Sequence, residues 1–449
     1  MIDSRRPLLV VLTSSLFVGA SAHGQEQEPK KTPTVEERLG ALEKAKADSL
    51  NVFWKDGVRF ESADKRYKFK LGGRIHYDTA FFDPDAATKA GVESTNATTG
   101  AKTRIEDGSE IRRARIELSG EVGDNVDWNT SYDFGGGTAN FRNIYVGLKE
   151  QLFGASVRAG QFKEPYGLEQ LTSSNHIMFM ERSLMNAFVP AFNAGFMVFD
   201  SCAAERVTWA LGTFRTGTDA GEVSNGDGEY AGTARLTGLP LMDEAGDDYV
   251  HLGLDYSLRS PTNDLQTFSS KPEANLAPTY VTTGTTMGAE SVDLIGFEAA
   301  WVRGPVTVSG EYTMAAIDAP SGSSADPDFN GYYVQAGYFI TGESRPYRKA
   351  QGCFDGIKPK ENAFGKEGGI GAWEVAARLS GIDLADQEDA VNGGELTDVT
   401  LGVNWYLNPN TRVMLNYIMA DLDPRNATGG PSGPSGDTDI IEFRVQFNF

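Results

Sequence analysis

Apolar and polar residues alternate with a period of two through most of this chain, and this pattern limits its possible folds more than any other feature. The last segment shows it clearly, since Ile441, Phe443 and Val445 alternate with Glu442 and Arg444. A period of two places the two sets of side chains on opposite faces of a β-strand. The pattern therefore predicts an all-β chain whose strands have one apolar and one polar face.

The alternating runs have the length and number expected of a membrane barrel. Each is about 8 to 13 residues long, which suits a tilted strand that crosses a bilayer. An even number of strands lets a closed antiparallel barrel return both chain ends to one side. Sixteen runs can be counted, and they begin near residues 67, 109, 127, 140, 154, 195, 206, 229, 248, 291, 305, 330, 370, 396, 411 and 437. We therefore expect a 16-stranded antiparallel transmembrane β-barrel over residues 67–449, preceded by a short helical segment.

The connections between the runs support this topology. Short turns on the periplasmic side and long loops outside are typical of outer-membrane barrels. The long connections are 79–108, 163–194, 260–290 and 422–436, and the short ones include 123–125, 303–305 and 408–410. Residues 343–369 are an exception, because they form a long connection on the expected periplasmic side. A soluble β-sandwich or propeller has the same alternation, but an export signal and the terminal Phe449 favour the membrane barrel.

The first residues have the features of a secretory signal peptide. Arg5 and Arg6 precede a mostly apolar stretch over residues 7–20, and small residues end at Ala22. This order predicts a signal peptide over residues 1–22 with cleavage after Ala22. Residues 23–66 are predicted to be a periplasmic segment. In it Val35 and Leu39 have helical spacing, so a short coiled coil within an oligomer or a simple linker are both open.

Charge and cysteine content limit the possible partners. The formal net charge of −21 argues against nucleic acid, which needs a basic surface, and it conflicts with an anion channel. The sequence contains no metal-binding or cofactor-binding motif that we consider reliable, so no cofactor is expected. Cys202 and Cys353 are both expected on the oxidising periplasmic side, where a disulfide between them could tether residues 343–369.

Several strings in the chain resemble the phosphate-selective porin O/P family. They are GQFKEPYGLE at 160–169, LTSS at 171–174, FMERS at 179–183, TGESRPY at 341–347, GAWE at 371–374 and NWYLNP at 404–409. The resemblance implies a homotrimer of 16-stranded barrels in the Gram-negative outer membrane, surrounded by lipid. It also implies inward-folding loops and a basic pathway for small anionic solutes. Residues 343–369 then look like one of the inward-folding segments.

Anion selection needs fixed positive charge where a pore is narrow, because the walls of low dielectric constant strengthen each charge. Lys163 and Arg182 belong to the connection 163–194, which is the best candidate for the constriction. Arginine suits brief phosphate contacts, since its planar fork offers two parallel donors. Inward parity adds Arg113, Arg115, Arg158, Arg235, Arg378, Arg412 and Arg444. The same parity applies to acidic residues, namely Glu117, Asp133, Glu298, Glu311, Glu374 and Glu442.

The sequence therefore predicts an outer-membrane porin that passes small solutes by passive diffusion, with anions such as phosphate preferred. The acidic inward residues leave a general or cation-preferring porin open. A structural or adhesin barrel plugged by its loops is a further alternative. An outer-membrane hydrolase is another, although no catalytic motif was found, and we expect no enzyme activity.

Overall fold

The structure is a computed structural model that describes residues 34–40, 49–95, 102–217, 221, 229–284, 287–320, 326–366, 368–386, 388–389, 391–424 and 435–449. The chain divides into two units, Met1–Asp48 and Ser49–Phe449. The predicted signal peptide lies outside the described residues, and its cleavage stays a prediction.

In the first unit, residues 35–40 are helical. Thr34 caps this helix, because its Oγ1 accepts from the N–H of Glu37 at 3.2 Å while Glu37 Oε2 accepts from the N–H of Thr34 at 2.8 Å. This reciprocal pair is a capping box. Val35 and Leu39 are exposed, so the apolar stripe has no partner within the described chain, and the coiled coil stays a prediction.

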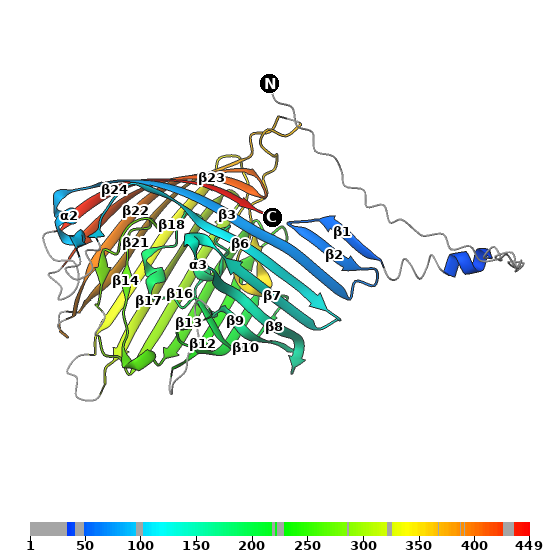
Figure 1. Ribbon diagram of the computed structural model, residues 1–449, viewed down its shortest axis with the longest axis horizontal. Coiled ribbons are helices and arrows are strands. Elements are labelled where there is room, and N and C mark those ends of the chain that lie inside the picture. The colour runs from blue at the N-terminus through cyan, green and yellow to red at the C-terminus, as the bar shows by residue number, and fades with distance from the viewer. Residues whose placement is uncertain are drawn as a thin grey trace, which may run out of the picture. The chain divides into compact units, whose positions relative to one another are not determined.

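In the second unit, sixteen strands of the described chain close into an antiparallel barrel (Figure 1). Each strand pairs with the next one along the chain, and β24 closes the barrel by pairing with β3 from Thr438↔Pro84 to Asn448↔Arg74. The barrel strands are β3 (Tyr67–Pro84), β6 (Gly108–Val122), β7 (Val126–Asp133), β8 (Asn140–Leu152), β9 (Ala155–Lys163), β10 (Phe192–Cys202), β11 (Val207–Arg215), β12 (Tyr230–Met242), β13 (Asp248–Arg259), β16 (Ser291–Arg303), β17 (Val306–Asp318), β18 (Asp328–Phe339), β21 (Ala372–Asp386), β22 (Val391–Asn408), β23 (Thr411–Asp423) and β24 (Gly436–Asn448).

The predicted strand order is confirmed, and the predicted starts agree closely with the observed ones. The largest difference is at β22, which was expected near residue 396 and begins at Val391. Strand boundaries follow the alternation because the pattern is a local property of each strand.

Small elements lie in the connections and before the barrel. A hairpin of β1 (Leu50–Trp54) and β2 (Val58–Ser62) pairs with the first part of β3, from Glu61↔Lys68 to Val58↔Leu71. The connections contain α2 (Ala86–Val92), β4 (Ser94–Thr95), β5 (Lys102–Thr103), η1 (Gly135–Gly137), α3 (Leu168–Leu171), η2 (Leu184–Ala187), η3 (Thr262–Asp264), β14 (Ser269–Ser270), β15 (Val281–Thr282), β19 (Tyr347–Arg348), η4 (Lys349–Gln351) and β20 (Cys353–Phe354).

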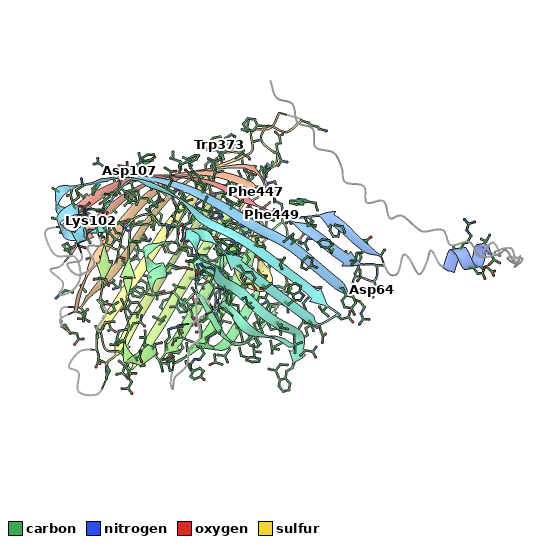
Figure 2. The ribbon with its side chains drawn as sticks, in the orientation of Figure 1. Asp64, Lys102, Asp107, Trp373, Phe447 and Phe449 are labelled. Carbon is green, nitrogen blue, oxygen red and sulfur yellow. The ribbon has the colours of Figure 1, made fainter. Side chains whose placement is uncertain are left out.

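The outer face of the barrel is apolar. On β16, Ile295, Phe297 and Trp301 are exposed while their neighbours along the strand are buried. Such an outward face suits contact with lipid, and aromatic rings suit the membrane interface. Figure 2 shows Lys102 and Asp107 toward one end of the barrel, and Phe447 and Phe449 toward the other.

A β-bulge interrupts the alternation on β6. The register passes from His76↔Arg113 to Tyr77↔Ile111, so Arg112 has no partner on β3. A bulge of this kind changes which face successive side chains take. As a result, Arg112 and Arg113 both contact Glu181 inside the barrel.

The predicted disulfide is wrong for this structure. Cys202 and Cys353 are both free thiols. Cys202 is exposed at the end of β10, whereas Cys353 is buried in the connection between β18 and β21. Sequence parity placed both near the same end of the barrel, but it could not show that one of them folds into the interior.

Candidate functional site

The connection between β9 and β10, residues 164–191, lies inside the barrel, and we call it the constriction loop. Its side chains Tyr166, Leu168 and Phe179 are fully buried. Gly167 has a φ of 76°, in a region that glycine adopts without strain, and α3 begins directly after it. The prediction that this connection folds inward is confirmed.

The wall binds the backbone of the constriction loop, which a buried loop requires because its carbonyl groups need donors. Arg412 donates to Ile177 O at 2.8 Å and to Met178 O at 2.9 Å. Arg378 donates to Glu181 O at 3.1 Å. Arg444 donates to Met180 O, and Gln446 donates to Asn175 O at 3.0 Å.

Four of these contacts come from three predicted pathway residues, and two of those arginines also pair with acids. Arg378 Nη2 lies 2.7 Å from Glu169 Oε1. Arg444 Nη2 lies 2.6 Å from Asp78 Oδ2 and 2.7 Å from Glu181 Oε1. Both arginine side chains are completely buried. Arg378, Arg412 and Arg444 therefore lie between the wall and the loop.

The connection 340–371, which we call the inward turn, enters the barrel from the opposite end with its first part, where Arg345, Phe354 and Ile357 are buried. Arg345 pairs with Glu374 and donates to His176 O of the constriction loop at 3.2 Å. Arg235, another predicted pathway residue, donates to Gly352 O at 2.8 Å and pairs with Glu298 at 2.7 Å. The expectation that this exceptional connection folds inward is confirmed.

Residues 260–290, which we call the second inward loop, bind the wall formed by β21 and β22. The Glu273 N–H donates to Asp398 Oδ2 at 2.7 Å. The Glu273 carboxylate accepts from Ser380 Oγ at 2.6 Å and from Thr400 Oγ1 at 2.8 Å. Glu273 is 3% exposed, so this loop also covers part of the wall.

The three inward segments cover a group of acidic residues on one side of the lumen. Asp255 accepts from Gly167 N at 3.2 Å, and Glu311 accepts from Glu169 N at 2.9 Å. Buried in this way, with at most 5% exposure, are Asp255, Glu298, Glu311, Glu374, Asp398 and Glu442. These carboxylates form the acidic wall, and they lie behind protein rather than facing water.

The opposite side of the lumen carries partly exposed cations, which we call the basic wall. Five of its side chains are 11% to 24% exposed, compared with 4% or less for Arg235, Arg378 and Arg444. These five are Arg74 on β3, Arg112 and Arg115 on β6, Arg142 on β8 and Arg158 on β9. Lys163 and Arg182, which are half-buried, and the more deeply buried Arg113 complete the basic wall.

Lys163 and Arg182, which were predicted to act at the constriction, are brought together. Both donate to the carbonyl oxygen of Gln170, Arg182 at 3.2 Å. Arg182 also donates to Glu169 O at 3.1 Å and to Thr172 O at 3.0 Å. Arg182 thus connects the later part of the constriction loop to residues 169–172 in its first part, next to the end of β9.

The cations of the basic wall outnumber the acids beside them, although each remaining strand arginine lies near one acid, and Arg74 lies 3.9 Å from Glu117. Arg115 pairs with Asp133 at 2.8 Å, and Arg142 lies 3.8 Å from the same carboxylate. Arg158 lies 3.9 Å from Asp127, and its guanidinium stacks 4.0 Å from the Tyr145 ring centre. The basic wall therefore keeps an excess of positive charge.

Sequence reasoning missed three members of the basic wall. Arg74 shares its parity with the inward His76, so the alternation could have identified it. Arg112 was missed because the bulge reverses its direction. Arg142 lies on β8, where the pairing with β7 is irregular between Thr130 and Tyr132, and the sequence offered no signal for it.

Glu181 is the acid most closely surrounded by the basic wall, and it lies in the constriction loop outside the strands. Burial raises the pKa of its carboxyl group. The positive charges of Arg112, Arg113 and Arg444 lower this pKa by more than burial raises it, so the pKa is well below its usual range. An ionised Glu181 holds these guanidiniums in place.

Two further properties concern the described residues alone. No group of histidine, cysteine, aspartate and glutamate residues among them is arranged to hold a metal ion. None of their helices is long and apolar enough to cross a membrane.

A closed sixteen-stranded barrel with an apolar outer face and loops that narrow its lumen is an outer-membrane porin. Residues 69–449 match the family described as "Phosphate-selective porin O and P", and the chain belongs to this family. It is 27% identical over 432 residues to Porin O of Pseudomonas aeruginosa, with 88% of this chain and 91% of that protein covered. The protein is an integral β-barrel of the Gram-negative outer membrane.

Solved structures share this fold at low sequence identity. An anion-selective porin from Comamonas acidovorans has a TM-score of 0.54 and 13% identity, with 85% of this chain and all of that chain covered. The outer-membrane channel DcaP of Acinetobacter baumannii has a TM-score of 0.51 and 10% identity, with 87% of this chain and 99% of that chain covered. At such identities the likeness supports the fold alone.

Proposed function

We propose that this porin is selective for small anions, including phosphate, and passes them by passive diffusion without a cofactor or covalent chemistry. The proposal rests on one observation, namely that acidic side chains of the lumen are more deeply buried than basic ones. The acidic wall lies behind the inward segments, while the basic wall is partly exposed. Exposed charge in a narrow tube acts on passing ions, whereas net charge mainly affects solubility and long-range steering. Anion preference is thus compatible with the net charge of −21.

The predicted pathway residues then fall into two groups. Lys163, Arg113, Arg115, Arg158 and Arg182 act on anions, together with the other members of the basic wall. The remaining four hold the inward segments in place and thereby set the pore width, and they are Arg235, Arg378, Arg412 and Arg444. Phosphate is supported by the family and by the similarity to Porin O, and by the planar fork of arginine, which matches phosphate oxygens.

The test is the zero-current potential of the purified protein in a planar bilayer under a KCl gradient. We expect a chloride-selective potential and a saturable reduction of the current by phosphate. Lys163→Glu reverses one charge beside the constriction, which changes the energy of a passing ion by about 1–2 kcal/mol in a hydrated pore. We therefore expect the chloride-to-potassium permeability ratio to fall about tenfold.

Arg303→Glu is the matched control for Lys163→Glu. Its side chain is 72% exposed beside the turn at residues 304–305, away from the lumen. We expect this variant to keep the permeability ratio of the unmodified protein. A cation-selective potential of the unmodified protein, or equal effects of both variants, contradicts the proposal.

We also propose that the mature protein lacks residues 1–22 and is a homotrimer. The trimer is supported by the family resemblance and by the exposed Val35 and Leu39 of the N-terminal helix. Native mass spectrometry of the purified protein tests both points, because it gives the chain mass and the number of chains. A monomer, or a chain of full-length mass, contradicts the corresponding part.

A further inference from the structure

A hollow of about 260 Å³ lies between the constriction loop and the second inward loop. Residues 181–187 form one side and residues 269–275 the other, and Arg112 and Arg113 border it. The volume corresponds to roughly eight or nine water molecules. The hollow is therefore larger than one inorganic oxyanion requires, and it has the size of a small organic molecule.

Positive charge collects on one side of this hollow. Glu181 lies 2.9 Å from Arg112 and 3.6 Å from Arg113, and it also pairs with Arg444 at 2.7 Å. One carboxylate shared by three guanidiniums cannot neutralise them all, and Asp78 compensates only Arg444. The Arg112 and Arg113 side therefore keeps an excess of positive charge.

The second inward loop contributes another cation. Lys271 Nζ donates to the carbonyl oxygen of Asn275 at 2.5 Å, which fixes the ammonium group at the hollow. Glu273 also lines the hollow, but wall residues occupy its carboxylate, including Arg378 at 3.2 Å. This acid is thus already compensated and does not cancel the charge of Lys271.

Neutral hydrogen-bonding groups make up much of the remaining lining. They are the hydroxyl groups of Ser269 and Ser270, the amide of Asn186, and the amide of Asn275, whose Nδ2 already donates to Glu110 Oε1 at 2.7 Å. Hydroxyl and amide groups can donate to and accept from the hydroxyl groups of a ligand, whereas guanidinium groups bind phosphate. An inorganic anion bound at Arg112 makes no contact with the neutral groups. A larger anion with hydroxyl groups can contact both the guanidinium groups and the neutral groups.

We propose that this hollow binds a phosphorylated polyol of about the size of a sugar phosphate. The phosphate group binds at Arg112 and Arg113, and the hydroxyl groups of the ligand bind Ser269, Ser270 and Asn186. The inference deepens the proposed function and rests on it for the route by which the ligand crosses the membrane. A bound ligand occupies the lumen next to the constriction loop and reduces the ion current.

The test uses the whole folded protein in a planar bilayer. The current in KCl is titrated with glucose 6-phosphate, with inorganic phosphate and with glucose. We expect glucose 6-phosphate to halve the current at a concentration at least fivefold lower than inorganic phosphate, and glucose to have no effect at that concentration. Equal half-blocking concentrations of the two phosphates overturn the inference, because the phosphate group alone is then recognised.

Ser270→Val removes a neutral group of the hollow without changing its charge. We expect the half-blocking concentration of glucose 6-phosphate to rise about fivefold, and that of inorganic phosphate to change less than twofold. The matched control is Ser344→Val in the inward turn, where the hydroxyl donates to Asp247 O, and it should leave both values unchanged. Equal increases for both phosphates in Ser270→Val also overturn the inference.

The unmodified protein separates this inference from the proposed function. A cation-selective zero-current potential contradicts the proposed function. The block by glucose 6-phosphate and by inorganic phosphate is then measured on the potassium current, and it still tests the inference about the hollow. A chloride-selective channel that both phosphates block equally contradicts only the inference about the hollow.

Discussion

Replacement of Arg444 by methionine tests whether buried ion pairs hold the constriction loop in the lumen. The Arg444 guanidinium donates to both oxygens of Asp78, at 2.7 and 2.6 Å, and to Glu181 at 2.7 Å. Arg444 and Asp78 are 0% and 2% exposed. Removing one partner of a buried ion pair costs about 3–5 kcal/mol, because the other charge is left uncompensated. Glu181 keeps Arg112 and Arg113, so this cost arises mainly at Asp78.

Methionine is suitable because it fills irregular space in a protein interior with an unbranched apolar chain. We expect Arg444→Met to lower the free energy of unfolding by about 3–5 kcal/mol, measured by urea unfolding in lipid vesicles with tryptophan fluorescence. The loss of the contact to Met180 O should also make single-channel currents larger and noisier.

The double variant Arg444→Met with Asp78→Asn is the matched control. It removes the uncompensated carboxylate as well, so we expect it to recover about half of the lost stability. If Arg444→Met unfolds at the same urea concentration as the unmodified protein, the ion pairs do not hold the loop. If the double variant is no more stable than the single one, the uncompensated charge is not the cause.

Three further predictions concern the backbone, the thiols and the inward turn. Gly160→Ala should prevent barrel folding, measured as the heat-dependent shift on a denaturing gel, because Gly160 has a φ of 131° and a Cβ there overlaps the backbone oxygen of Ile144 on β8. Gly232→Ala, whose Cβ meets nothing within 4 Å, should fold normally. A maleimide should label Cys202 in the folded protein and Cys353 only after unfolding, and two fast-reacting thiols contradict the burial of Cys353. Arg235→Met should increase the single-channel conductance, because the inward turn loses its donor to Gly352 O, and an unchanged conductance contradicts this role.

The sequence alone determined the strands of this protein and their two faces. A period of two is a local property, so the run ending at Phe449 predicts its own strand and its own outward side. The lengths of the connections also identified the constriction loop and the inward turn, since both are unusually long. The same reasoning predicts Lys163 and Arg182 as pathway residues, and only the structure shows that both donate to Gln170 O.

Only the tertiary structure decided which inward charges face water. Arg115 and Arg378 have the same inward parity, but Arg115 is partly exposed while Arg378 is buried against Glu169. Arg378 and Glu169 are 209 residues apart, and no local pattern links residues at that distance. The bulge that turns Arg112 inward likewise depends on the pairing of β3 with β6. The sequence therefore predicts a lumen with charges of both signs. The packing of the inward segments buries the acidic wall and leaves the strand arginines of the basic wall partly exposed, because a loop buries the charges that bind it most closely.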